Sequence, residues 1–252
     1  MDAPRKYAEW MSQHEHVDRL GLVYRYHSRS DAHSKALCGF IMEDLLEYCS
    51  VLKRQVASRE VVWGTNIRFR FPISQKDKTL DLVIGPPVVQ AAGATPASRK
   101  SLSDVFVACE AKSVMTEHGK SQPRVFDELN SSHGIVHAGR PDAIAAGITV
   151  VNIASTFVSP LRQVPSRREL AISHHHQPDV AAKMVQHLRG LPLRNRVGEV
   201  GFDAYATIVV ECDNQGPVTL WTDPPAPQPG APDSYDEFVR RIGRFYEERF
   251  AG

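Results

Sequence analysis

The stretch VFVACEAKSVMTEH, residues 105–118, decides the fold because its character changes halfway along. Its first half is rich in strand-forming apolar residues, whereas Glu110 and Lys112 then place a carboxylate and an ammonium two positions apart. Side chains two positions apart on a strand share a face. We therefore predict a strand whose apolar face, with Cys109 and Ala111, packs into the domain, and whose other face is charged.

A lone acidic residue, Asp81, lies in an earlier strand pattern at residues 79–85. Alternation along a strand predicts Leu80, Leu82 and Ile84 on one face and Asp81 on the other. If this strand neighbours the strand of Glu110 and Lys112, the three charged side chains converge on one small cleft.

The remaining patterns predict an α/β fold. Residues 60–64 and 66–72 read as strands joined by a turn at residues 64–66, and residues 85–103 as a loop. Further strands are expected at residues 148–154, 204–212 and 217–221. Helices are expected at residues 3–20, 34–52 (capped by Ser34), 121–132, 141–147, 178–191 and 234–250.

Bulk properties exclude several classes of protein. The chain has 252 residues and a formal net charge of +1, so it carries no strongly basic coat for nucleic acid. Its four cysteines form no C-x-x-C pair, which favours a reducing compartment, and we find neither a secretory signal nor a membrane span. A cytoplasmic protein is expected. Nucleotide-binding glycine motifs are also missing from the sequence.

Two carboxylates and a lysine around one cleft have a recognised chemical use. The carboxylates of Asp81 and Glu110 can hold Mg²⁺, which prefers oxygen ligands and retains several waters. The Lys112 side chain can orient the attacking water or help to deprotonate it, and can stabilise charge that develops on a phosphate. These are the parts needed for phosphodiester hydrolysis.

The arrangement of Asp81 followed by CEAKS at residues 109–113 resembles the PD-(D/E)xK, or restriction-endonuclease-like, nuclease superfamily. The resemblance implies a single domain with an α-β-β-β-α-β core and a mixed central sheet flanked by helices. Residues 34–158 would form this core, residues 1–33 a helical extension, and residues 159–252 added strands and a helix for DNA binding or dimerisation. Leu80 departs from the family pattern, which has proline before the aspartate.

The resemblance also implies an activity and partners. We expect a Mg²⁺-dependent endodeoxyribonuclease, with Mn²⁺ as a substitute, that acts on double-stranded DNA as a homodimer or higher homo-oligomer. A bacterial restriction or anti-phage system is the expected setting. Many members add an acid on the first core helix, for which Glu43 is the first candidate and Glu47 the alternative. Gln122 is the candidate for a polar assisting residue after the motif.

Basic residues outside the motif are candidate DNA contacts. Lys120 and Arg124 follow the charged strand closely enough to approach the scissile phosphate or its neighbours. Residues 160–200 hold seven Lys and Arg against three acids, a local excess that marks a candidate DNA-facing surface. We select Arg167, Arg168, Arg194 and Arg196 there. An ordinary solvated basic face is the alternative.

Other interpretations of the same residues remain open. Glu110 and Lys112 are also compatible with an exposed strand end, and the chain with a non-catalytic nucleic-acid-binding or assembly module that retains the fold. The histidine run at residues 174–176 raises the further possibility of a zinc hydrolase. Consecutive histidines point in different directions, however, and lack the i,i+4 spacing of a zinc site.

Overall fold

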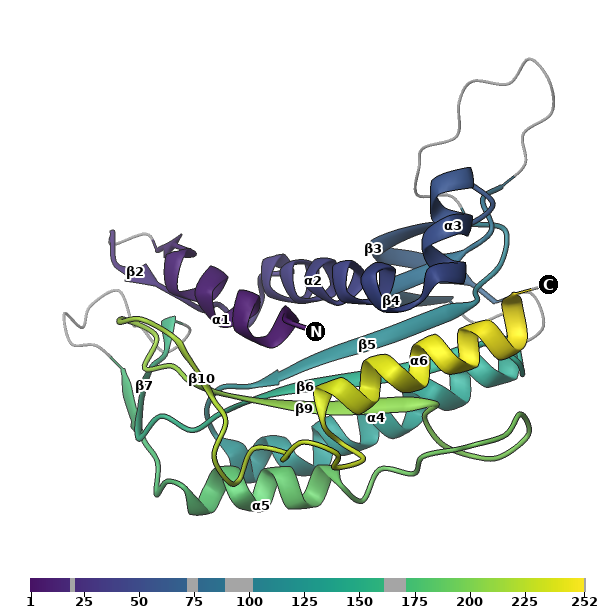
Figure 1. Cartoon of the computed structure of the whole chain (residues 1–252). Coiled ribbons are helices and arrows are strands. Elements are labelled where there is room, and N and C mark those ends of the chain that lie inside the picture. Colours follow the sequence, from purple (N-terminus) through teal and green to yellow (C-terminus); the bar gives the residue numbers. More distant parts are fainter. Residues whose placement is uncertain (19–20, 72–76, 89–101, 161–170, 252) are drawn as a thin grey trace.

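The central element of the computed structural model is a mixed six-stranded sheet between two layers of helices (Figure 1). The structure describes residues 1–18, 21–71, 77–88, 102–160 and 171–251. The strands of this sheet are β3 (Val62–Arg70), β4 (Asp77–Gly85), β5 (Val107–Val114), β6 (Ile144–Asn152), β9 (Ala204–Glu211) and β10 (Thr219–Trp221). Their spatial order is β10-β9-β6-β5-β4-β3. Strands β5, β6 and β9 are parallel, and the other neighbours are antiparallel.

Each face of the sheet buries its own hydrophobic cluster. One face is covered by α1 (Ala3–Gln13), α2 (Ala32–Tyr48), α3 (Ser50–Ser58) and α6 (Tyr235–Phe250), and the other by α4 (His118–Gly139) and α5 (Asp179–Leu188) (Figure 1). Ile41, Leu82 and Phe238 belong to the first cluster, and Val83 and Leu129 to the second. Both terminal segments therefore share the core of the central sheet.

Strand β6 replaces a helix that the sequence pattern predicted at residues 141–147. All nine of its residues are buried, since it lies between the parallel strands β5 and β9 with helices on both faces. A strand buried on both faces has an uninterrupted apolar sequence, which periodicity alone does not distinguish from a buried helix. The strand expected at residues 148–154 is the second half of this element.

The first predicted helix is shorter than expected. Helix α1 ends at Gln13, and two short strands, β1 (His16–Val17) and β2 (Val23–Tyr24), then pair in antiparallel fashion. The backbone N–H of Leu22 donates to Asp18 Oδ1 at 3.0 Å, and Gly21 has φ of +78°. A turn with a positive φ cannot continue a right-handed helix.

The second predicted helix divides in two. Helix α2 is N-capped at Asp31 rather than Ser34, and it ends before Cys49, whose backbone is extended. The Cys49 Sγ accepts a hydrogen bond from the Leu52 N–H and so caps α3. The continuous apolar spacing hid this break.

The turn predicted at residues 64–66 is wrong, because β3 runs through it. Thr65 pairs with Leu82 and Ile67 with Leu80, so β4 accompanies β3 on both sides of Asn66. Asn66 has φ of +52°, and asparagine tolerates this conformation better than most residues. The polar triplet therefore marks an irregularity inside a strand.

Several other predictions are confirmed. Helix α5, strands β9 and β10, and helix α6 lie where the sequence places them, and the Ser234 side chain accepts from the Glu237 N–H at 3.4 Å. Helix α4 is longer than the predicted 121–132, and β7 (Thr156–Val158) pairs with β8 (Ile172–His174). Most of the predicted loop at 85–103 lies outside the described residues. None of the helices described has the length and hydropathy needed to cross a bilayer.

Candidate active site at the separation of β4 and β5

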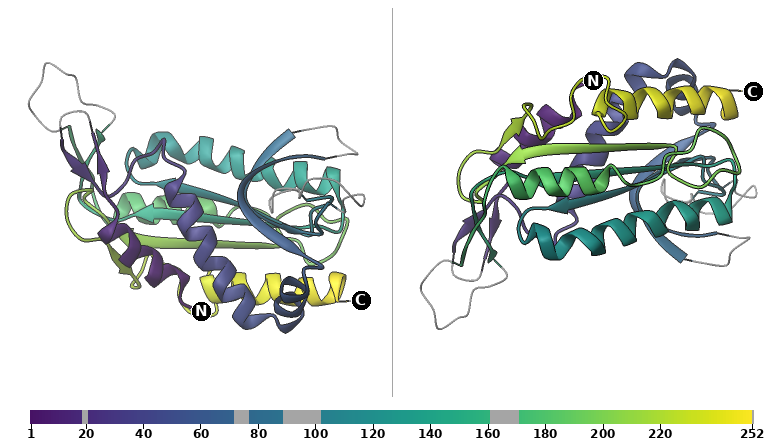
Figure 2. Two further views of the ribbon diagram at one scale, coloured as in Figure 1. Left: turned by 90° about the horizontal axis from the view of Figure 1, so that it is seen from above. Right: turned by 90° about the horizontal axis from the view of Figure 1, so that it is seen from below.

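The candidate site lies where β4 leaves β5. The paired residues of these strands run from Ile84 opposite Val107 to Leu82 opposite Cys109. Asp81 follows on β4, and its Oδ2 accepts a hydrogen bond from the backbone N–H of Ala111 at 2.8 Å. A side chain thus takes the place of the next backbone contact, while the β3–β4 pair curves away from the rest of the sheet (Figure 2). The two strands are neighbours, as convergence of the charged residues requires.

The side chains of β4 do not alternate regularly at Asp81. The prediction that Leu80, Leu82 and Ile84 share one face of the strand is therefore wrong. Leu80 packs in the cluster beneath α4, whereas Leu82 and Ile84 pack in the cluster beneath α2. Asn66, with its positive φ, lies between the β3 residues that pair with Leu80 and Leu82. The local irregularity turns the Asp81 carboxylate toward β5.

Glu110 lies at the centre of the charged groups. It is only 7% exposed, and each of its carboxylate oxygens has an ammonium partner. Lys112 Nζ lies 2.8 Å from Oε1, and Lys78 Nζ lies 2.9 Å from Oε2. Unpaired, a carboxylate this deeply buried would be strongly destabilising. Strand alternation predicted that Glu110 and Lys112 share a face, whereas the contact of Lys78 with Glu110 was not predicted.

No pattern in the sequence identifies Lys78 as a member of this site. It precedes Asp81 by three positions, and in a regular strand such residues point to opposite faces. The break in alternation at Asp81 is what allows both side chains to approach Glu110 from β4.

Helix α4 extends the line of alternating charges. Lys112 Nζ also contacts Glu128 Oε2 at 3.2 Å, and Arg124 Nε lies 3.7 Å from Glu128 Oε1. Ser132, one turn further along, donates from Oγ to Glu110 Oε2 at 3.4 Å. Because Lys112 is shared between two carboxylates, its position is fixed by both β5 and α4.

The pKa values of the two carboxyl groups of the site are shifted in opposite directions. Burial, reinforced by the charge of Glu110, raises the pKa of Asp81 to about 6. Burial also disfavours the charged form of Glu110, but Lys112 and Lys78 outweigh it and lower the pKa of that carboxyl. For Lys112, burial is likewise outweighed by Glu110 and Glu128, which raise its pKa. The lysine is therefore a cation at neutral pH.

A hard divalent cation fits the donor set of Asp81 and Glu110. Part of the upward shift in the pKa of Asp81 comes from the negative charge of Glu110, so the two carboxylates repel one another. A cation between them would relieve this repulsion, and Mg²⁺ needs only one or two carboxylates because it retains waters. In the described ranges, no group of three or more His, Cys, Asp or Glu is placed to hold a metal ion.

The middle residue of the histidine run, His175, makes structural contacts. His175 contacts Thr116 Oγ1 through Nε2 at 3.1 Å and the Ala154 carbonyl oxygen through Nδ1 at 3.0 Å. Both nitrogens are therefore engaged in holding the segment after β8 against the ends of β5 and β6.

Two of the candidate residues lie away from the site. Glu43 is exposed on α2, and its Oε2 lies 2.7 Å from Lys6 Nζ of α1. The alternative on that helix, Glu47, is also exposed. Gln122 Nε2 donates to the Lys183 carbonyl oxygen of α5 at 3.3 Å. Neither predicted addition to the Asp81, Glu110 and Lys112 set is brought to it.

The basic residues selected as DNA contacts divide into three groups. Lys120 and Arg124 are exposed on α4, and Arg196 is exposed in the segment before β9. Arg194 is 1% exposed and donates to Asp203 and to two backbone carbonyl oxygens, so its prediction as a DNA contact is wrong. Arg167 and Arg168 lie outside the described residues. Local charge density alone did not separate a buried arginine from exposed ones.

A cleft of about 330 Å³ adjoins the site at the end of β5. Ser113, which follows Lys112, lines it together with Tyr26, Ser28, Ser121 and Arg124. The walls thus combine one arginine and one carboxylate, Glu117, with several hydroxyl groups, and the arginine and the hydroxyl groups can contact phosphate oxygens.

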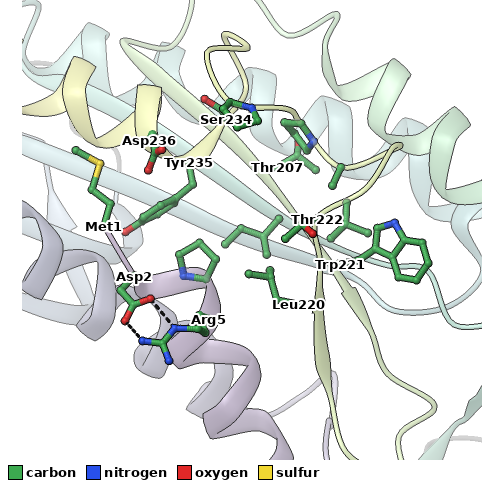
Figure 3. Close-up of a pocket in the computed structure, with 16 residues that line it drawn as sticks. Met1, Asp2, Arg5, Thr207, Leu220, Trp221, Thr222, Ser234, Tyr235 and Asp236 are labelled. Atoms are coloured by element: carbon green, nitrogen blue, oxygen red, sulfur yellow. Dashed lines mark hydrogen bonds and ion pairs between the residues drawn. The ribbon is translucent and has the colours of Figure 1, made fainter.

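A second cavity, of about 350 Å³, lies between the first turns of α1 and α6 and the β9–β10 edge (Figure 3). Leu220, Trp221 and several prolines form much of its lining, and Asp2 pairs with Arg5 at its rim. It shares no lining residue with the charged cleft at the end of β5.

No protein family, curated protein or solved structure matches this chain. The geometry and electrostatics of the site are therefore the basis for proposing a function.

Proposed function

We propose that the chain is a Mg²⁺-dependent endodeoxyribonuclease of the restriction-endonuclease-like class. The observation that carries the proposal is the pair of buried carboxylates, Asp81 and Glu110, with opposite pKa shifts and a doubly anchored lysine beside them. A buried carboxyl whose pKa is raised by burial and by a second carboxylate, as that of Asp81 is, is a candidate functional group. The element order α2-α3-β3-β4-β5-α4-β6 supports the proposal because, apart from the additional helix α3, it is the order expected for the 34–158 core.

The proposed roles follow from the contacts. Asp81 and Glu110 would hold the cation, which when bound lowers the pKa of a coordinated water and offsets charge on the phosphate. Lys112 is a cation at neutral pH, so it acts as a hydrogen-bond donor that orients the water and stabilises phosphate charge. Asp81 must lose its proton to bind metal, so metal affinity and cleavage should both rise as the pH passes through about 6.

The substrate and assembly are part of the proposal. Arg124 and the hydroxyl groups of the 330 Å³ cleft would follow the DNA backbone next to the cut phosphate. One site per chain would cut one strand, so we propose a homodimer acting on double-stranded DNA. Light scattering of the purified chain, with and without a DNA duplex, tests this assembly.

Cleavage of supercoiled plasmid tests the chemistry. Purified protein with Mg²⁺ should nick or linearise the plasmid, and EDTA should stop it. Asp81→Ala and Lys112→Ala should each reduce cleavage at least about 100-fold, because each removes a group that acts on developing charge. Asp77→Ala is the matched control on the same strand, since Asp77 pairs with the exposed Arg68. Unchanged cleavage by both site variants, with folding verified by circular dichroism, would contradict the assignment.

A non-catalytic nucleic-acid-binding module is the second candidate. It is favoured by one observation: both oxygens of Glu110 already carry an ammonium, so the site is neutralised by its own lysines. This candidate predicts DNA retention in gel shifts with a steep dependence on salt and no nicking with Mg²⁺ or Mn²⁺.

A further inference from the structure

Lys78 is the member of the site that neither the motif nor the proposed mechanism uses. Its side chain is 16% exposed, and its Nζ lies 2.9 Å from Glu110 Oε2. We propose that Lys78 is a positioning residue that competes with the divalent cation for Glu110 and passes to the substrate phosphate when the cation binds. This inference rests on the proposed function of the site.

Both carboxylate oxygens of Glu110 already have an ammonium partner. A cation shared with Asp81 needs a Glu110 oxygen, and each oxygen is already within 3 Å of an ammonium, at 2.8 and 2.9 Å. Placing Mg²⁺ beside either ammonium without movement would bring like charges into contact. One lysine must therefore move when the cation binds.

Among the residues described, Lys112 is held by more ion pairs than Lys78 is. Lys112 is held by two carboxylates, Glu110 at 2.8 Å and Glu128 at 3.2 Å, on two different elements. In the described part of the chain, the ion pair of Lys78 is the one with Glu110. Lys78 has fewer contacts to lose, and it enters from β4, the strand that also supplies Asp81.

Binding of a divalent cation would change the net charge of the site. Asp81 and Glu110 balance Lys78 and Lys112 before the cation binds, so the resting site carries little net charge. Once the cation is bound, the same four groups and the cation form a strongly positive centre. A displaced Lys78 ammonium on a flexible stem can then contact a non-bridging phosphate oxygen. The lysine would thus offset part of the repulsion between the buried carboxylates at rest and add substrate affinity when the metal is present.

Metal affinity in the absence of DNA tests the competition directly. Binding of Mn²⁺ to the full-length chain can be followed by the loss of the free-ion electron paramagnetic resonance signal. Lys78→Met removes the competing charge and keeps most of the side-chain volume, so Mn²⁺ should bind roughly tenfold more tightly than to the wild type. Lys78→Arg restores the charge and should return the affinity toward the wild-type value. Lys53→Met, on the exposed side of α3, is the control.

Substrate kinetics test the second half of the proposal. At saturating Mn²⁺, Lys78→Met should raise the KM for DNA several-fold, since a phosphate contact is lost, and Lys78→Arg should largely restore it. A purely structural role would instead loosen Mn²⁺ binding in both variants, because Glu110 would be misplaced. Lys78→Gln provides a second neutral variant should the methionine variant unfold.

The outcomes separate the two proposals. If the wild type binds Mn²⁺ in an Asp81-dependent manner and cuts DNA, but the neutral Lys78 variants bind Mn²⁺ no more tightly, the role of Lys78 is overturned alone. If the wild type neither binds Mn²⁺ through Asp81 nor cuts DNA, both proposals are overturned.

Discussion

Asp203 and Asp81 are both aspartates of the central sheet held by neighbouring donors, yet their environments are opposite. Asp203, just before β9, is fully buried, and its carboxylate accepts hydrogen bonds from Arg194, Arg249 and a backbone N–H. His137 Nε2 lies 3.1 Å from its second oxygen. Burial favours the neutral acid, but these partners prevail and lower the pKa of Asp203. The pKa of Asp81 is raised.

The difference separates an ion network that stabilises its aspartate as a charged group from one that favours the neutral acid. Asp203 joins α4, β6, β9 and α6 through partners that satisfy both of its oxygens, so its charge is stabilising where it lies. Asp81 is buried within the influence of another carboxylate, Glu110, and its negative charge is destabilising there. Proteins commonly accept such local destabilisation at functional sites. The two aspartates should therefore respond in opposite ways to the same substitution.

The largest effect on stability is expected at Asp203. Asp203→Asn removes the charge that compensates Arg194 and Arg249, which are 1% and 10% exposed. We expect the free energy of unfolding to fall by about 3–5 kcal/mol, measured by urea denaturation. Asp142→Asn, which removes a half-exposed partner of Arg140, should change it by less than about 1 kcal/mol. An equal response of the two variants would refute the distinction between them.

Asp81→Asn should have the opposite sign. At pH 8 the wild-type carboxylate is ionised in a site that favours its neutral form, and asparagine removes that charge while it can still accept from the Ala111 N–H. We expect the free energy of unfolding to increase by roughly 1–3 kcal/mol, following 1.4 kcal/mol per pKa unit. Cleavage should be lost in the same variant. A destabilised Asp81→Asn protein would show that the site is structural.

The pH dependence provides a further test of the same comparison. The folded pKa of Asp81 lies above the ordinary 3.8, at about 6, so between these values the folded state holds a proton that the unfolded state has lost. Its contribution to stability is therefore full below about pH 4 and is lost as the pH rises through about 6. The pKa of Asp203 is lowered, so its contribution is full above the unfolded value of 3.8 and is lost as the pH falls further. In denaturation curves measured from pH 3 to 8, the loss of stability around pH 6 that is due to Asp81 should be absent from the Asp81→Asn variant.

Divalent cation should partly cancel the destabilisation at Asp81. At a Mg²⁺ concentration ten times its dissociation constant, the wild type should gain about 1.4 kcal/mol of stability, seen as a rise in Tm. Asp81→Asn should gain much less, whereas Lys53→Met should gain as much as the wild type. Equal stabilisation of Asp81→Asn and wild type would place any metal elsewhere.

The smallest effects on stability are expected at the exposed cations of α4. Lys120→Ala and Arg124→Ala should change the free energy of unfolding by less than about 0.5 kcal/mol, since both side chains are largely exposed. Each should nevertheless reduce the salt dependence of DNA binding by about one phosphate contact. Gel shifts over a range of NaCl concentrations measure this, with Lys53→Ala as the control. An unchanged salt dependence would remove α4 from the DNA surface.

Local sequence patterns predicted the elements that have a strong periodic signal. The final helix with its Ser234 cap, helix α5, and the β9–β10 pair follow from spacing and capping residues alone. The shared face of Glu110 and Lys112 follows from strand alternation in the same way. Strand β6 was mistaken for a helix in part because burial on both faces erases the alternation that identifies a strand.

The site residues that the sequence missed depend on an irregularity. Lys78 joins Asp81 at Glu110 because alternation in β4 breaks opposite Asn66, and no residue pattern in β4 announces that break. Arg194 was misassigned for a related reason. A basic segment looks the same whether its arginines face solvent or a buried aspartate nine residues away.

The sequence by itself determined that a charged strand end follows an apolar strand, that Asp81 precedes it on a separate strand, and that helices precede and follow this run of strands. These properties are local, since side-chain period and helix capping act within a few residues. Only the tertiary structure decided that β4 separates from β5 at Asp81, that Lys78 reaches Glu110, and that Asp81 and Asp203 have opposite pKa shifts. Burial and charge pairing are set by residues distant in the chain, and the free energy of an ionised group depends on all of them at once.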